Sequence, residues 1–342
     1  MKIALIGAGR IGRLHARHLA ADPATRELLI ADALPKAAET AARDTGGRSV
    51  PTVDEALDLA DAVVIAAATD AHAALVRAAV ERGLPTFVEK PLALELNETE
   101  DLVELIEESR VPVQVGFQRR FDRAYREGRR LVEAGELGRI YLVRLIAHDA
   151  EPPPPAYIPT SGGMFRDSSI HDFDAFRYIT GGEVESVFAL GTVRVDEVFE
   201  RHDDVDTVGA LLRLADGTLG VLSATRHNPR GYDIRMELVG ARDSVSMGVG
   251  PRTPSRSLEP DASPTEAAWE SFLTRFEDAY RAELAAFVAM ARGESDSPCT
   301  AGDAFEAMRI AVAATISHRE SRVVKLAEIA RSRTEVTHAP VS

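Results

Sequence analysis

Cysteine and positive charge are both scarce in this sequence. Cys299 is the single cysteine among 342 residues, and 40 Lys and Arg stand against 54 Asp and Glu, which gives a net charge of −14. One thiol cannot form an internal disulfide, and an unpaired thiol is typical of a reducing compartment, so we expect a cytoplasmic protein. A strongly acidic chain without a segregated basic patch is repelled by nucleic acid and by anionic membranes, so we expect neither as a partner.

Long apolar runs are also missing. The longest uncharged run, residues 62–68, is far shorter than the ~18 residues that a membrane-spanning helix requires. The apolar residues 1–9 are interrupted by glycine and followed by Arg10, so they are too short for the core of a signal peptide. With 24 Gly and 18 Pro the composition is not that of a disordered chain, and the length predicts about two globular domains.

The first 120 residues alternate short apolar runs with alanine-rich stretches, a pattern typical of parallel strands joined by crossover helices. The runs predict strands at 2–6, 28–31, 49–53, 62–67, 86–88 and 113–117. The stretches between them predict helices, most clearly at 9–20, 35–45, 71–82 and 97–109. We therefore predict an α/β domain over residues 1–120, with a doubly wound parallel sheet.

The remaining residues follow a different pattern. From about residue 135, polar and apolar residues alternate over longer runs, as in antiparallel strands with one exposed face. Strands are predicted at 140–147, 205–214, 218–225 and 233–238, and helices at 163–180, 275–292 and 301–319. Asp216-Gly217 suits a tight hairpin between two of the strands. Residues 121–342 are therefore predicted to form an α+β domain with a large, mainly antiparallel sheet flanked by helices.

A glycine motif connects the first predicted strand to the first predicted helix. Residues 7–12 are Gly-Ala-Gly-Arg-Ile-Gly and fit G-x-G-x-x-G. Such glycines permit a tight turn and a close approach to a pyrophosphate, although a tight turn alone would also explain them. Asp32 ends the second strand, where its carboxylate can bind a ribose diol and would repel a 2′-phosphate. We therefore expect NAD in preference to NADP, with the nearby Lys36 leaving NADP open.

Two further loops follow predicted strands, at residues 69–72 and 89–91. Open parallel sheets bind ligands at this end of their strands. Lys90 could donate hydrogen bonds to a substrate hydroxyl and to a nicotinamide ribose, and its charge would favour loss of the hydroxyl proton. The alternatives are a solvated loop lysine for Lys90 and a surface histidine for His72.

An acid and a histidine share one face of the helix predicted at 163–180. Asp167 and His171 are four residues apart, and Asp174 and Tyr178 continue the same polar stripe. Oxidation of an alcohol requires a base with a pKa near neutral, and His171 beside a carboxylate would supply one. A solvated helix face would have the same spacing, so the pattern alone leaves both interpretations open.

No metal site is expected. One cysteine and scattered histidines provide no recognisable ligand spacing. His202, Asp203, Asp204 and Asp206 do cluster, and we interpret this cluster as an exposed acidic turn.

Together, the glycine motif, Glu-Lys-Pro at 89–91 and Asp167-x-x-x-His171 resemble the Gfo/Idh/MocA family of NAD(P)-dependent oxidoreductases over nearly the whole chain. Residues 116–122 (Gly-Phe-Gln-Arg-Arg-Phe-Asp), 161–163, 170–174 and 231–233 are most similar to its inositol 2-dehydrogenase branch. The resemblance implies an N-terminal Rossmann domain and a C-terminal open sheet. The exposed face of that sheet would build a homodimer or homotetramer, and substrate would lie between the sheet and the nicotinamide.

The resemblance also implies residue roles. Lys90, Asp167 and His171 would be catalytic, and Arg119, Asp149 and Tyr232 would line the substrate site. With the glycine motif, the implied cofactor-binding residues are Gly7, Gly9, Arg10, Ile11, Gly12, Asp32, Thr69, His72 and Glu89. Lys90 would fix the reacting hydroxyl, His171 would remove its proton and Asp167 would orient and charge His171.

The implied reaction is oxidation of a secondary hydroxyl of a cyclic polyol or sugar. Myo-inositol, giving the 2-keto inosose, is the first candidate, because no phosphate or carboxylate clamp is visible beyond Arg119 and Arg120. Arg230 stands where some inositol enzymes carry an aromatic residue, and Gln118 where many have Met. These departures leave open scyllo-inositol or another sugar as the substrate, in oxidation or keto-reduction. A non-catalytic NAD-binding regulator with the same fold is the alternative of a different class.

Overall fold

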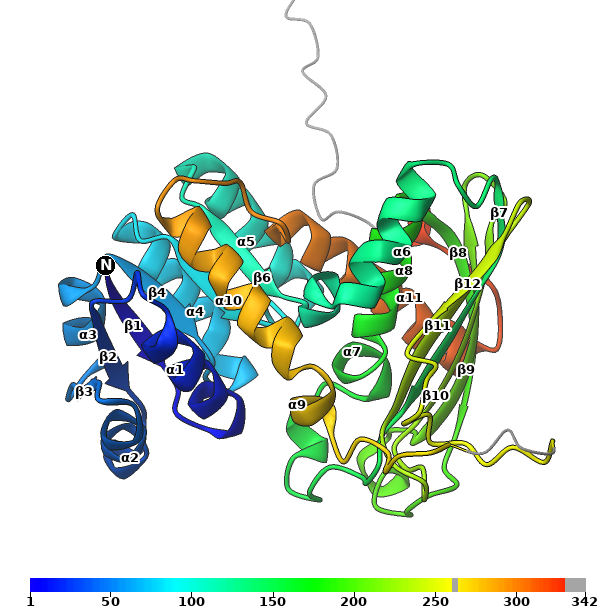
Figure 1. Ribbon diagram of the computed structural model, residues 1–342, viewed down its shortest axis with the longest axis horizontal. Coiled ribbons are helices and arrows are strands. Elements are labelled where there is room, and N and C mark those ends of the chain that lie inside the picture. The colour runs from blue at the N-terminus through cyan, green and yellow to red at the C-terminus, as the bar shows by residue number, and fades with distance from the viewer. Residues whose placement is uncertain (260–263, 330–342) are drawn as a thin grey trace, which may run out of the picture.

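The computed structural model describes residues 1–259 and 264–329. Within these residues the chain forms one sheet of six strands and one of seven, which lie toward opposite ends of the molecule (Figure 1). The strands are β1 (Lys2–Ile6), β2 (Glu27–Ala31), β3 (Arg48–Ser49), β4 (Ala62–Ile65), β5 (Thr86–Glu89), β6 (Val113–Gly116), β7 (Ile140–His148), β8 (Val184–Thr192), β9 (Thr207–Leu214), β10 (Leu219–Thr225), β11 (Asp233–Gly240), β12 (Ser244–Met247) and β13 (Val324–Lys325).

The helices are α1 (Arg10–Ala21), α2 (Pro35–Thr45), α3 (Val53–Leu59), α4 (Thr69–Glu81), α5 (Leu96–Ser109), α6 (Arg123–Glu133), α7 (Met164–Asp167), α8 (Ile170–Thr180), α9 (Phe272–Arg275), α10 (Glu277–Ala291) and α11 (Ala301–Glu320). Short 3₁₀ helices are η1 (Gln118–Phe121), η2 (Ile158–Thr160), η3 (Glu200–His202) and η4 (Leu326–Glu328). In the described part of the chain, no helix is long and apolar enough to cross a membrane.

The first sheet confirms the predicted doubly wound α/β architecture. Its strands are parallel in the order β3-β2-β1-β4-β5-β6, and the direction of winding reverses between β1 and β4. The loops after β1, β4 and β5 therefore emerge side by side at the edge where such sheets bind nucleotides. The strand predicted at 49–53 ends at Ser49, because the Thr52 side chain accepts a hydrogen bond from the Glu55 amide and caps α3.

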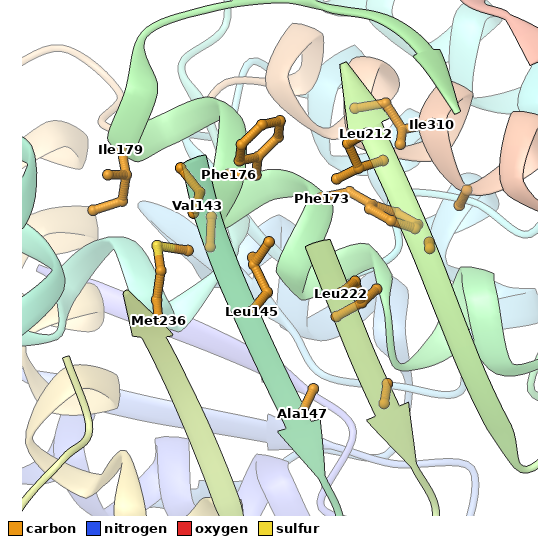
Figure 2. Close-up of a cluster of buried hydrophobic side chains, with 14 of the residues drawn as sticks. Val143, Leu145, Ala147, Phe173, Phe176, Ile179, Leu212, Leu222, Met236 and Ile310 are labelled. Carbon is orange, nitrogen blue, oxygen red and sulfur yellow. The ribbon is translucent and has the colours of Figure 1, made fainter. Parts of the chain in front are cut away.

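The second sheet is mainly antiparallel, as predicted, in the order β12-β11-β7-β10-β9-β8-β13. One pair, β7 with β10, is parallel. α6, α8 and α11 lie on one side of the sheet (Figure 1). Figure 2 shows how Phe173, Phe176 and Ile179 of α8 pack against strand residues such as Leu145 and Leu222. Alternate strand residues are thus buried in the core on one face of the sheet, and the residues between them are exposed on the other face.

The prediction of one helix over 163–180 is wrong, because this segment forms two helices. α7 ends at Asp167 and α8 begins at Ile170, so Asp167 and His171 do not share one continuous helix. The predicted polar stripe is not a solvated face either. Asp174 is buried, and its carboxylate accepts hydrogen bonds from Arg120 at 2.6–3.1 Å.

The C-terminal helices return to the first sheet. Leu284, Phe287 and Val288 of α10 share a core with Ile3 and Leu5 of β1. α11 packs against α5 as well as against β8, so it contacts both halves of the molecule. These contacts hold the two sheets on either side of a cleft whose walls come from both.

Candidate active site

A cleft of about 780 Å³ lies at the carboxyl edge of the first sheet and opens toward the second sheet. It brings together most of the residues predicted from the sequence. Those that line it are Arg10, Ile11, Thr69, His72, Glu89, Lys90, Arg119, Asp149, Asp167, His171 and Tyr232. Gly7, Gly9, Gly12 and Asp32 form the loop region beside it.

The glycine loop has the shape that a dinucleotide requires. Gly7 has φ +98°, and a Cβ there would lie 2.5 Å from the Ala66 carbonyl oxygen. A Cβ at Gly12 would lie 2.0 Å from the Gly7 oxygen, so both glycines are needed for the turn itself. Gly9 differs, because among the described residues no heavy atom beyond its own chain neighbours and helix backbone lies within 4 Å of its Cβ position. A side chain there would fill open space at the start of α1, where a pyrophosphate would approach.

Asp32 connects the end of β2 to this loop. Its Oδ2 accepts a hydrogen bond from the Ala8 amide at 2.6 Å, and its Oδ1 accepts one from the Leu34 amide at 2.7 Å. A carboxylate has about four acceptor positions, so two remain for ribose hydroxyls. The glycine loop and Asp32 therefore fit an adenine dinucleotide.

His72 is buried, so its interpretation as a surface histidine is wrong. Nδ1 lies 2.8 Å from the Pro91 carbonyl oxygen and Nε2 lies 3.2 Å from that of Ala67. Burial lowers the pKa of the imidazole, which favours the neutral ring. His72 therefore connects the loops after β4 and β5 on the wall of the cleft.

Lys90 is not a solvated loop lysine, since its side chain is only 17% exposed. The ammonium group reaches from the end of β5 to α7, where it donates to the main-chain oxygen of Asp167 at 2.8 Å and to Oδ1 at 3.2 Å. An ammonium group has three protons, so one remains for a ligand in the cleft.

Asp167 accepts hydrogen bonds from three side chains in the described part of the chain. Besides Lys90, the Tyr157 hydroxyl donates to Oδ1 at 2.8 Å and Arg226 donates to Oδ2 at 2.7 Å. Burial raises the pKa of Asp167, but the charges of Lys90 and Arg226 and these hydrogen bonds hold it below the usual value. Among the described residues, no hydrogen bond joins Asp167 to His171, so the structure does not show the predicted orientation of His171 by Asp167; the carboxylate holds Lys90 instead.

His171 lies on the cleft wall with its ring edge-on to Phe117, at a centroid distance of 5.8 Å. Desolvation lowers its pKa well below the usual value, the positive charges of Lys90 and Arg119 lower it further, and the charge of Asp167 opposes them. Nδ1 is buried and has no hydrogen-bond partner in residues 1–259 and 264–329. This direction favours the neutral ring, the form that accepts a proton. The prediction that a neighbouring carboxylate keeps the pKa of His171 near neutral is wrong, because burial and the two positive charges outweigh Asp167.

The predicted substrate residues surround the same space. Arg119 is buried and donates a hydrogen bond to the Asp172 carboxylate. Tyr232, which directly precedes β11, is also buried. The Asp149 carboxylate, at the end of β7, accepts a hydrogen bond from Arg226 at 3.4 Å.

Arg226 and Tyr157 belong to the site but are not among the residues predicted from the sequence. Arg226 follows β10 and Asp149 follows β7, and the two strands pair in parallel with Thr225 opposite His148, which brings the next residues together. Only the parallel pairing of β7 with β10 places Arg226 beside Asp149, and the sequence predicted a mainly antiparallel sheet. Tyr157 lies beyond the proline-rich residues 152–154, which line the cleft with it.

A metal site is not evident in the described residues, because no group of three or more His, Cys, Asp or Glu is arranged to hold an ion. A dinucleotide loop at the switch point of a parallel sheet, facing an ammonium group and a neutral imidazole, is the arrangement of a nicotinamide-dependent oxidoreductase.

Comparison with known proteins agrees with this class. Residues 1–117 match the oxidoreductase family with an NAD-binding Rossmann fold, and residues 125–246 match the GFO/IDH/MocA C-terminal domain. The chain belongs to the Gfo/Idh/MocA family of oxidoreductases.

Several inositol dehydrogenases are similar over nearly their whole length. The myo-inositol dehydrogenase Hyg17 of Streptomyces leeuwenhoekii is 42% identical, over 92% of this chain and 96% of its own. The myo-inositol 2-dehydrogenase of Thermotoga maritima is 34% identical, over 96% of this chain and 99% of its own. The structure of scyllo-inositol dehydrogenase from Lactobacillus casei with NAD(H) and scyllo-inositol has a TM-score of 0.85 at 28% identity, covering 96% of this chain and 99% of that one.

Proposed function

We propose that this enzyme oxidises a secondary hydroxyl of a cyclic polyol with NAD, and that myo-inositol, giving the 2-keto inosose, is its first candidate substrate. One observation carries the proposal: Lys90 and a neutral His171 share a cleft with the dinucleotide loop. The inositol dehydrogenases named above support the polyol, because they match over nearly the whole chain.

The charges in the cleft favour an uncharged substrate. Lys90 is paired with Asp167, Arg119 with Asp172, and Arg226 with both Asp167 and Asp149. A guanidinium group that clamps a substrate phosphate or carboxylate would have to give up its own partner. Polyol hydroxyls, in contrast, can bind to the remaining donors and acceptors of these pairs.

In the proposed mechanism, Lys90 donates its remaining hydrogen bond to the oxygen of the reacting hydroxyl and favours the alkoxide through its charge. His171 removes the hydroxyl proton, with Nε2 as the ring nitrogen available because Nδ1 is enclosed. Asp167 anchors Lys90, and its charge partly restores the basicity of His171. NAD, when bound, supplies the nicotinamide ring that accepts the hydride.

We further propose NAD in preference to NADP. The Asp32 carboxylate is fixed by two backbone amides at the place where a 2′-phosphate would lie, and two negative charges there would repel each other. Lys36 is exposed on α2 and carries a positive charge that could attract a 2′-phosphate, so the experiment below also tests NADP.

The outer face of the second sheet supports a homo-oligomer. Leu190, Leu211, Leu219 and Val221 are exposed on adjacent strands, with Leu211 54% and Leu219 48% exposed. Contiguous apolar surface of this kind is typical of an interface. We propose that this face joins copies of the chain into a dimer or tetramer, and that the enzyme works in the cytoplasm, where its single thiol stays reduced.

The experiment is a panel of inositols, aldopyranoses and their keto forms with NAD or NADP, in which nucleotide absorbance is followed and the product is identified. Oxidation of a cyclic polyol with NAD would support the proposal, and myo-inositol should have the highest kcat/KM. Turnover of a pyranose alone would show that the substrate is a sugar other than an inositol. Tight NAD binding without turnover of any compound in the panel would favour a non-catalytic NAD-binding regulator.

A further inference from the structure

Behind Lys90 lies a buried imidazole–carboxylate pair that the proposed mechanism does not use. His15 is fully buried in α1, and its Nε2 lies 2.7 Å from Oε1 of Glu89, the last residue of β5. A carboxylate can only accept, so His15 donates from this nitrogen. The Glu89 side chain is 12% exposed and lines the cleft.

The surrounding side chains hold both groups in place. The His15 ring lies edge-on to Phe87 at 5.4 Å and to Tyr280 of α10 at 5.8 Å, measured between ring centroids. On the other side of Glu89, a Cβ at Gly116 would lie 3.0 Å from Oε2, so the strand backbone packs closely against the carboxylate. A buried polar pair enclosed in this way has little freedom to rearrange.

The pair connects the cofactor helix to the catalytic lysine. Glu89 Oε2 accepts a hydrogen bond from the Lys90 amide at 3.3 Å, and the Lys90 ammonium then reaches Asp167. α1 begins at the glycine loop, and Arg10 and Ile11 at its start line the cleft. One chain of contacts therefore runs from the dinucleotide loop through His15, Glu89 and Lys90 to α7.

We infer that His15 is a positioning residue: through Glu89 it fixes Lys90 relative to the nicotinamide site, so that hydride transfer depends on a side chain that touches neither substrate nor cofactor. The inference rests on the proposed function for its kinetic consequence. A displacement of about 1 Å at a reacting group costs on the order of a hundredfold in rate, so this support affects kcat more than binding.

The test compares His15→Leu, which keeps volume and removes the donor, with His15→Gln, which can still donate to Glu89. His15→Leu should lower kcat about ten- to a hundredfold while the Kd for NAD changes less than about threefold, and His15→Gln should recover most of the loss. His18→Leu, one turn further along the same helix, is the matched control and should leave kcat unchanged. Equal losses in His15→Leu and His18→Leu would overturn the inference.

A second readout needs no substrate. Acetylation of lysines is measured by peptide mass spectrometry, and the Lys90 ratio is the extent of acetylation of Lys90 divided by that of exposed Lys36. This ratio should rise at least about threefold in His15→Leu, because Lys90 is released from Asp167. If wild type oxidises no polyol, the proposed function fails and this ratio still decides the role of His15. An unchanged ratio would overturn it.

Glu89→Met removes the acceptor of the same hydrogen bond and covers the case in which His15→Leu does not fold. It should raise the Lys90 ratio as well, and the His15→Leu/Glu89→Met double variant should be no slower than the slower single variant, because both remove one interaction. Losses that multiply in the double variant would show two independent roles and contradict the inference.

Discussion

Arg226→Gln tests the electrostatic design of the cleft most sharply. The Arg226 guanidinium is 6% exposed and joins the carboxylates of Asp167 and Asp149. Loss of one member of a buried ion pair costs about 3–5 kcal/mol, and since Asp167 keeps Lys90 and Tyr157, we expect about 3 kcal/mol here. For a chain of this size that corresponds to a Tm lower by roughly 4 °C.

The same substitution should change catalysis in a defined direction. Arg226 contributes to the low pKa of Asp167, so its removal raises that pKa, and the acid limb of kcat/KM should move to higher pH. The ionised Asp167 stabilises the fold above the ordinary aspartate pKa of about 4, and this contribution is lost as pH falls through the folded value. In Arg226→Gln the loss should therefore begin at the same pH but be smaller and be complete at higher pH, because only the folded pKa has risen.

At neutral pH, a looser Asp167 should lower kcat/KM about a hundredfold. The assay is a pH series of kcat/KM with parallel thermal unfolding. Arg130→Gln is the matched control, because Arg130 is exposed on α6 and its carboxylate partners face solvent. An Arg226→Gln enzyme within about twofold of wild type, with an unmoved acid limb, would refute the reasoning.

Three further predictions follow from the same geometry. Tyr157→Phe removes one charge-assisted hydrogen bond to Asp167 from a partly exposed hydroxyl, so steady-state kinetics should show kcat lower by about fivefold, and an unchanged kcat would contradict that role. Gly9→Ala should weaken NAD binding at least about tenfold by calorimetry without loss of Tm, whereas Gly12→Ala should lose stability. The folded pKa of His171 lies below the unfolded value of about 6.5, so acidification below that pH favours unfolding, and His171→Gln should flatten the dependence of Tm on pH there.

The parts of this protein that sequence predicts well have local causes. α2 spans Pro35–Thr45, as predicted, because Pro35 suits its first turn and Gly46 adopts the left-handed conformation that ends it. Fully buried parallel strands such as β1 read as continuous apolar runs. The glycine loop is equally local, since steric contacts within a few residues and one neighbouring strand decide it.

The parts that sequence misses depend on partners far along the chain. Arg226 is 59 residues from Asp167, and its position follows from the parallel pairing of β7 with β10, which are not consecutive strands. Asp174 shares the predicted polar stripe with His171, yet it is buried because Arg120, 54 residues away, neutralises it. Spacing within one helix cannot reveal such partners.

The central claim is that Lys90 and His171 carry out NAD-dependent oxidation of a ring hydroxyl in this cleft. The most direct measurement is NADH formation with myo-inositol by wild type, Lys90→Ala and His171→Ala, with NAD affinity measured in each. We predict turnover by wild type and a loss of at least about a thousandfold in kcat in both variants, with NAD affinity within about threefold of wild type. Either variant keeping more than about a tenth of wild-type kcat would contradict the claim.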